Sequence, residues 1–303
     1  MSTTVRAFMF HDVRDLSETN YPERYKLKSF LRKKDFEFQI EHILNRYEVI
    51  RSDELNKINY DDGKDYAVLT FDDGLFDHYY VYKYLKSKNI SGTFLIPKLP
   101  VTTGKMIPTN KIQFILSVCD EKELASEILS CFEDKDEIWS KYSKTKWKNN
   151  WWSKEMIFIT NILRNHKTND FNNYEYMDFL FEKYVHSNEF EFSKDFYLNL
   201  KQIDEMSNNN MVIGGHGNTS ENLLLIDDYE YDIKESFEFI SKYSDKNIFS
   251  YPNGGYNDDI KEVMRRNNCD LSFTVNPMTI TNLDHLDYLE FPRYDAPQKL
   301  PLL

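Results

Sequence analysis

The stretch Val68-Leu69-Thr70-Phe71-Asp72-Asp73-Gly74 carries the strongest structural signal in the chain. An apolar run that begins at Tyr66 predicts a buried strand, and this strand ends in two adjacent carboxylates and a glycine. Two like charges at a strand end are unfavourable unless a metal ion, a cationic side chain or a shared proton compensates them. Asp-Gly is also a common turn dipeptide, so the stretch alone is equally compatible with an ordinary acidic turn.

The segments on both sides of this stretch alternate between strands and helices. A helix is expected after the diacid and a second apolar strand follows it, and a strand–helix–strand unit of about 30 residues makes its strands parallel. In parallel sheets and barrels, functional side chains gather at the C-terminal ends of the strands. The pattern predicts strands at 6–10, 66–71, 92–97, 211–214, 248–251, 271–275 and 289–291, and helices at 36–47, 79–88, 229–243 and 258–267.

Residues from about 100 to 200 interrupt this alternation. Large apolar residues recur there at helical spacing between charged ones, which predicts a helical insertion within a single domain of residues 1–303. Two interpretations of its aromatic residues remain open, a substrate groove or packing of the insertion, and packing is the favoured one. The insertion contains Trp139, Trp147, Trp151 and Trp152.

Composition excludes several classes of function. A net charge of −12 leaves no basic excess for nucleic acid and disfavours an anionic membrane surface. The three cysteines, Cys119, Cys131 and Cys269, lack the spacing of a disulfide framework or a thiolate zinc site. The N-terminal apolar run of about five residues is too short for a signal peptide, and no run reaches membrane-spanning length. We therefore expect a soluble, cytoplasmic protein.

Polar residues with catalytic potential follow the predicted strands. Taken singly, each has an ordinary structural explanation: a hydrogen-bonded histidine, a turn, or a solvated arginine. Their succession on one α/β alternation is much more specific, because parallel strands bring their C-terminal ends together. The residues are His11, Asp72, Asp73, His216, the turn 252–254 and Arg293.

These motifs resemble those of the polysaccharide deacetylases of carbohydrate esterase family four. Thr70-Phe71-Asp72-Asp73-Gly74 matches the first family motif in full. Gly215-His216-Gly217-Asn218-Thr219-Ser220 is similar to the second motif, and Phe249-Ser250-Tyr251-Pro252-Asn253-Gly254 to the third. Phe8-Met9-Phe10-His11-Asp12-Val13 resembles the opening of the permuted members. The resemblance covers residues 5–98 and 210–296.

The resemblance implies a distorted (β/α)₇ barrel with a helical insertion and a metal-dependent removal of N-acetyl groups from a carbohydrate substrate. Asp73 and His216 would hold a divalent metal, with zinc as the first candidate. Asp72 would be the general base, which requires a bend at the strand end, permitted by Gly74, because adjacent strand residues face opposite ways.

Three further residues complete the implied mechanism. His11 would protonate the leaving amine, since histidine titrates near neutral pH. The backbone N–H of Asn253 would complete an oxyanion hole. Arg293 would orient or neutralise Asp72.

The chain departs from the family pattern at two positions. Ser220 stands where the second metal histidine is expected, and Ser250 stands where the third motif has arginine. Serine is a poor zinc ligand and a catalytic zinc site normally has three protein ligands, so Asn222, His78 or a water would supply the third one. Arg293 would replace the positive charge that is missing at Ser250.

Two alternative functions follow from these departures. The barrel could bind a carbohydrate without hydrolysing it, with the aromatic insertion as the binding surface. It could also hydrolyse a related bond, as a deformylase or an O-deacetylase, because function follows the site more than the fold.

Overall fold

The computed structural model describes residues 3–27, 30–58, 63–144, 152–168, 171–281 and 286–296. The chain divides into two compact units. The first comprises Met1–Asp15, Leu31–Lys105 and Ser193–Leu303, and the second comprises Leu16–Phe30 and Met106–Phe192. Most of the expected insertion therefore lies in the second unit, together with a short N-terminal segment that the sequence pattern did not assign to it.

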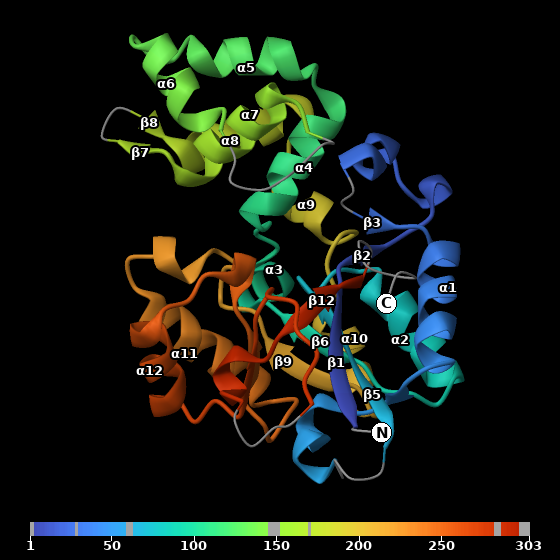
Figure 1. Ribbon diagram of the computed structural model, residues 1–303. Coiled ribbons are helices and arrows are strands. Elements are labelled where there is room, and N and C mark those ends of the chain that lie inside the picture. Colours follow the sequence, from blue (N-terminus) through green and yellow to red (C-terminus); the bar gives the residue numbers. More distant parts are fainter. Residues whose placement is uncertain are drawn as a thin grey trace. The chain divides into compact units, whose positions relative to one another are not determined.

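The first unit is a nearly closed barrel of parallel strands (Figure 1). Its strands are β1 (Thr4–Phe10), β4 (Glu48–Val49), β5 (Asp65–Asp72), β6 (Thr93–Ile96), β9 (Val212–Gly215), β10 (Ile248–Ser250), β11 (Leu271–Phe273) and β12 (Arg293–Asp295). In the described part of the chain, seven of them follow the order β11-β10-β9-β6-β5-β1-β12, and β4 pairs with β5 outside this path. The backbone of Phe291 closes the ring, since its N–H donates to Ser272 and its carbonyl accepts from Thr274, both at 2.8 Å. The expected (β/α)₇ barrel is confirmed.

Amphipathic helices follow the strands of this unit. In α1, for example, Phe36, Ile40 and Ile43 recur at intervals of four and three and are buried, as one face of a helix requires. Asparagine or aspartate side chains cap several helices, and Asn199 and Gln202 form a capping box at the start of α10. The helices are α1 (Lys33–Leu44), α2 (His78–Ser87), α3 (Lys98–Thr103), α10 (Leu200–Ser207), α11 (Tyr229–Ile240) and α12 (Asp258–Arg266). A separate pair of short strands, β2 (Asp12–Val13) and β3 (Phe30–Leu31), accompanies them.

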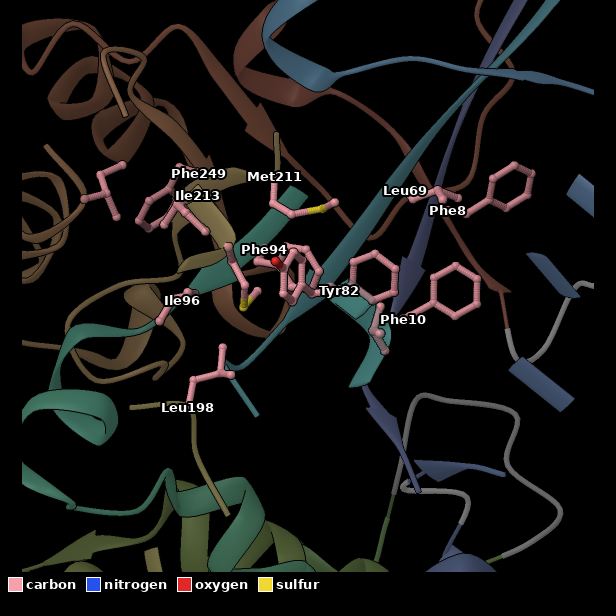
Figure 2. Packing of buried hydrophobic residues seen from close by; sticks show 14 of the residues in the cluster. Phe8, Phe10, Leu69, Tyr82, Phe94, Ile96, Leu198, Met211, Ile213 and Phe249 are labelled. Atoms are coloured by element: carbon pink, nitrogen blue, oxygen red, sulfur yellow. The ribbon is translucent and has the colours of Figure 1, made fainter. Parts of the chain in front are cut away.

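The strands carry two apolar layers because their side chains alternate between the two faces of the sheet. The outer layer packs against the helices, and Figure 2 shows part of it, including Phe8, Leu69 and Phe94. The inner layer fills the barrel interior toward the N-terminal ends of the strands. Its members include Val5, Ala7, Val68, Leu95, Val212, Ile248, Leu271 and Phe273. On several strands this inner alternation continues toward the C-terminal end with polar residues, and these form the candidate site; they include Thr70, Asp72, His216 and Ser250.

The second unit is mainly helical. Trp139 packs there against Phe158, with ring centroids 5.0 Å apart, and Trp147 and Trp151 lie outside the described residues. No helix in the described ranges has both the length and the apolar character that crossing a membrane requires. The elements of this part are α4 (Pro108–Val118), α5 (Glu121–Leu129), α6 (Lys135–Tyr142), α7 (Lys154–Asn165), β7 (Lys167–Thr168), β8 (Phe171–Asn172), α8 (Asn173–Tyr184) and α9 (Glu189–Ser193).

Candidate active site

Strand alternation places the predicted catalytic positions inside the barrel. Thr70 lies level with Met9 and Thr93 on the neighbouring strands, and Asp72 lies level with Leu95. Alternate residues of a strand share one face. On β1 the inward face therefore continues from Met9 to His11, and on β9 it continues from Gly214 to His216. The C-terminal ends of adjacent parallel strands thus bring these side chains to one end of the barrel.

Asp72 forms a bidentate ion pair with Arg293 inside the barrel. The two Nη atoms of the guanidinium donate to the two carboxylate oxygens at 2.7 and 2.9 Å. Arg293 also donates to Thr70 Oγ1 at 3.0 Å and through Nε to the carbonyl of Thr274 at 2.9 Å. Both charged side chains are almost completely buried. This hydrogen-bond network therefore holds the guanidinium of Arg293 against the carboxylate of Asp72.

The position of Arg293 in its strand corrects the sequence-based expectation. The apolar residues 289–291 predicted a strand with Arg293 beyond its end, but Tyr288–Glu290 form a short 3-10 turn. The side chain of Asp287 accepts from the N–H of Leu289 at 2.9 Å and stabilises this turn. The strand β12 begins at Arg293, opposite Ala7, and the long side chain reaches along the barrel interior to Asp72.

Opposing effects determine the pKa of Asp72. Burial raises it, whereas Arg293, and then His216 and His11, lower it by more, so the pKa falls from 3.8 to about 2. For the neighbouring Asp73 the balance is reversed. Burial raises the pKa of Asp73 above 3.8 in spite of His216 and His11, and the charge of Asp72 adds to the increase. Asp72 has a cationic partner, whereas burial, with the charges of Asp72 and Asp12, favours the neutral form of Asp73.

Asp73 points toward His216 because the backbone turns at Asp73 itself. The strand β5 ends at Asp72, and Asp73 adopts a φ of +81°, followed by Gly74 at +61°. The expected bend therefore begins one residue before the glycine. A positive φ is unfavourable for a residue with a Cβ, so the surrounding structure must hold this turn. The turn places Asp73 Oδ1 3.5 Å from His216 Nε2.

Ser250 holds the His216 ring from the opposite side. Nδ1 of His216 lies 3.1 Å from the carbonyl oxygen of Ser250 and 2.6 Å from its hydroxyl. In the tautomer with the proton on Nδ1, this nitrogen donates toward the Ser250 carbonyl, and Nε2 presents a lone pair toward Asp73. This is the arrangement in which metal-binding histidines are usually held.

Ser220 completes the group around Asp73. Its hydroxyl donates to Asp73 Oδ1 at 3.2 Å, and the residue is buried. Asp232 of α11 fixes the loop that carries Ser220: its carboxylate accepts from the N–H groups of Asn218 at 2.8 Å and Thr219 at 3.1 Å. The hydroxyl of Thr219 adds a third bond at 2.9 Å. Asp232 thus positions the second motif.

His11 and His78 meet beneath the strand end. The Nε2 of His78 donates to the carbonyl of His11 at 3.2 Å. His78 is fully buried against the rings of Phe71 and Phe94, which stack on each other, and burial lowers its pKa from 6.5 to about 4. The side chain of His11 is partly exposed, and its charge contributes to the lowered pKa of Asp72. The structure therefore places His11 near the diacid and His78 in the core.

The remaining two predicted residues lie in neighbouring turns. Asn253 occupies the turn Pro252–Gly254 with a φ of +55°, and its side chain is exposed. Asn222 accepts from the N–H of Leu224 at 3.0 Å and lies against Gly255, where an added Cβ would meet its Oδ1 at 1.8 Å. The described contacts thus place the Asn222 side chain against the third-motif loop.

The donor set around Asp73 fits a divalent cation with two strong ligands. Asp73 is largely buried and has no Lys or Arg partner within the described residues. His216 presents Nε2 to it, and a cation between the two would satisfy both. The described part of the chain has no group of three His, Cys, Asp or Glu side chains suited to a metal, and Ser220 occupies the third position.

Two contacts in this site had no signal in the sequence. Asp232 lies on a helix among residues that show nothing unusual, and Thr274 acts through its backbone carbonyl. Ser250 was noted as a missing arginine, but its contact with His216 was not anticipated. Side chains that act from a neighbouring helix, and backbone groups, leave no motif in the sequence.

Comparison with known proteins agrees with this fold. No family model and no curated protein sequence matches the chain. It is similar to BC0361, a polysaccharide deacetylase from Bacillus cereus, with a TM-score of 0.58 and 14% identity over 97% of this chain and 65% of that one. The Streptococcus pyogenes deacetylase PplD in complex with acetate gives a TM-score of 0.56 and 15% identity, over 97% and 93%. IcaB from Ammonifex degensii gives 0.57 and 13%, over 98% and 94%.

These likenesses establish the fold. The chain spans slightly less than two thirds of the length of BC0361 and more than nine tenths of the other two proteins. It has the fold of polysaccharide deacetylases, as the resemblance of its motifs implied.

Proposed function

We propose that the chain is a metal-dependent hydrolase that removes an N-acetyl group from a sugar or a polysaccharide precursor. The observation that carries this proposal is the meeting of Asp72, Asp73 and His216 at one end of the barrel, with Arg293 committed to Asp72. The structural neighbours BC0361, a polysaccharide deacetylase, and PplD, a deacetylase, support the same reaction class.

The two aspartates have different roles in this proposal. Asp73 and His216 hold a divalent cation, zinc being the first candidate, and this ion supplies Lewis acidity toward the acyl carbonyl and the attacking water. Asp72 removes a proton from the water. With a pKa of about 2 it is ionised at neutral pH and can accept this proton, but it is a weak base, so the bound cation would have to acidify the water.

His11 and Asn253 act on the other atoms of the amide. His11 follows β1 at the same barrel end as Asp72 and donates a proton to the leaving amine. Without this proton the amine is a poor leaving group. The backbone N–H of Asn253 donates to the oxyanion that develops when the carbonyl is attacked.

The test is acetate release from N-acetylated sugar oligomers after loading with zinc or cobalt. The wild type should release acetate, a chelator should abolish release, and readdition of the ion should restore it. Asp72→Asn is the matched control, because it keeps the shape of the side chain and removes the base. No acetate from any N-acetylated sugar would contradict the proposal.

Ser220 favours one second candidate, a barrel that binds carbohydrate without hydrolysing it. A hydroxyl in place of a metal histidine weakens the site that hydrolysis requires. Sugar affinity without turnover, unchanged by Asp72→Asn and by chelators, would support this alternative. N-formyl and O-acetyl sugars in the same assay distinguish a deformylase or an O-deacetylase from an N-deacetylase.

A further inference from the structure

Two atoms from other residues lie beside one oxygen of Asp73, so that three potential metal-binding atoms are close together. His216 Nε2 lies 3.5 Å from Asp73 Oδ1, and Ser220 Oγ lies 3.2 Å from the same atom. Asp73 follows β5, whereas His216 and Ser220 both lie in the loop after β9, and all three are largely buried. Ser220 thus lies at the place where a third protein ligand would complete the site, with its hydroxyl turned toward Asp73.

The loop holds Ser220 in a conformation that serine adopts reluctantly. Its φ is +59°, in the left-handed region, which is uncommon for a residue with a Cβ. Three hydrogen bonds to Asp232 fix the two preceding residues. Gly217 has a φ of +74°, and a Cβ there would lie 2.6 Å from Asp232 Oδ1. The strain at Ser220 is therefore maintained by a dedicated clamp, which keeps its hydroxyl beside Asp73.

We propose, on the basis of the function proposed above, that Ser220 Oγ is the third protein ligand and that it reduces the preference of the site for zinc over harder cations. The donors are then a carboxylate oxygen, a hydroxyl oxygen and one imidazole nitrogen. Hydroxyl oxygens are ligands of ions such as Mg²⁺, whereas a second imidazole favours zinc. The preference for Zn²⁺ over Mn²⁺ is consequently smaller here than in a site with two histidines.

The test measures metal affinity in the apoprotein and needs no substrate. Titration against a chromophoric chelator gives the dissociation constants of Mn²⁺ and Zn²⁺. Ser220→Gly removes the hydroxyl and relieves the positive φ, so reduced folding cannot explain a loss of affinity. Its Mn²⁺ affinity should fall at least about tenfold, because loss of a ligand costs at least as much as loss of a supporting residue. Its thermal unfolding temperature should not fall.

Ser220→His tests the same inference in the opposite direction. Histidine is among the residues that tolerate a positive φ, so the substitution is compatible with the loop. It should increase the Zn²⁺ affinity at least about tenfold and raise the ratio of Zn²⁺ to Mn²⁺ affinity. The absorption of bound Co²⁺ should also change, which reports on the coordination directly.

Controls separate this inference from the function on which it rests. Asn218→Ala keeps the backbone bond to Asp232 and should bind both ions as the wild type does. If Ser220→Gly binds Mn²⁺ as tightly as the wild type, Ser220 is not a ligand, and the proposed function stands. If the wild type binds neither ion more tightly than Asp73→Asn does, the metal dependence of the proposed function also fails.

Discussion

At Asp72, two physical effects of similar size act on one carboxyl group. Burial favours the neutral acid, and the bidentate contact with Arg293 favours the carboxylate, which prevails. Arg293 is fully buried, and among the described residues it has no acidic partner other than Asp72. Because the two charges compensate each other, removing one of them leaves the other buried without a partner and destabilises the fold.

Arg293→Met should destabilise the fold by about 3–5 kcal/mol at neutral pH, because it leaves a buried carboxylate without its partner. The native pKa of Asp72 lies below its unfolded value, so the pair stabilises the fold above pH 4 and this contribution is lost as the pH falls toward 2. It amounts to roughly 2 kcal/mol. Denaturant unfolding at a series of pH values measures both effects.

The double variant Asp72→Leu with Arg293→Met is the control for this prediction. It removes both charges and keeps similar volumes, so it should be more stable than Arg293→Met alone. A single variant as stable as the wild type, with unchanged acid dependence, would show that the pair is not a unit.

His11→Asn should lower kcat for an N-acetylated sugar by about 10²–10⁴, the usual contribution of a general acid. An activated aryl ester, whose leaving group needs no proton, should lose much less activity. The ratio of the two rates in wild type and variant measures this effect. An equal loss on both substrates would assign His11 a structural role, and unchanged metal affinity would confirm that the metal ligands are intact.

At the scale of elements, the site follows from strand periodicity. The side chains of His11, Asp72 and His216 could be predicted to meet because parallel strands align their C-terminal ends and alternate residues face inward. Arg293 was predicted as a residue, but its strand was not, because the turn at Asp287 depends on a local side-chain contact.

Other contacts were beyond sequence reasoning. Asp232 lies 14 residues from Asn218 on a helix, and nothing in its neighbourhood distinguishes it from a solvated acid. The segment 16–30 belongs to the second unit through contacts that no local pattern indicates. Periodicity predicts which face a residue occupies, whereas the partner of a helix side chain depends on tertiary packing.

Gly217→Ala should destabilise the second motif more than a Gly→Ala substitution that introduces only the strain of a positive φ. The new Cβ would lie 2.6 Å from Asp232 Oδ1, so overpacking adds about 1–3 kcal/mol to the backbone strain. Gly104→Ala is the matched control, because Gly104 has a φ of +75° at the C-terminal end of α3. It should cost about 1 kcal/mol.

Thermal unfolding measures the stability of both glycine variants, and chelator competition measures their metal affinity. Metal binding should fall in Gly217→Ala and remain at the wild-type level in Gly104→Ala. Equal effects of the two substitutions on both quantities would show that the Asp232 clamp is unimportant.

His78→Phe should remove a source of acid sensitivity at the start of α2. The native pKa of His78 is about 4 against 6.5 in the unfolded chain, so unfolding takes up a proton between these values. Stability is greatest above pH 6.5 and declines by about 3 kcal/mol as the pH falls to 4. Phenylalanine should pack against the rings of Phe71 and Phe94, as His78 does, and flatten this decline.

Unfolding free energies at pH 5 and pH 7 measure the effect of His78→Phe. The substitution also removes the buried Nδ1, which has no hydrogen-bond partner in the described part of the structure. It loses the bond to the His11 carbonyl, so a small decrease in stability at pH 7 is expected. If the difference in unfolding free energy between pH 5 and pH 7 is the same in the variant and the wild type, His78 is not the source of this acid sensitivity.

At the scale of the molecule, the two ends of the barrel interior differ in composition. Apolar residues fill the interior toward the N-terminal ends of the strands, and charged residues occupy the C-terminal ends. The closure of the ring at Phe291 brings β12, and with it Arg293, beside β1 and within reach of Asp72 on β5. A nearly closed ring thus allows residues from opposite ends of the sequence to form one site.

The most direct test of the central claim is the fate of ¹⁸O-labelled water during turnover of an N-acetylated sugar. Mass spectrometry of the products should show one ¹⁸O atom in the released acetate and a free amine on the sugar. Asp72→Asn and the metal-depleted protein should produce neither. Intact sugar after prolonged incubation of the metal-loaded wild type, or acetate without the label, would contradict a hydrolytic deacetylase.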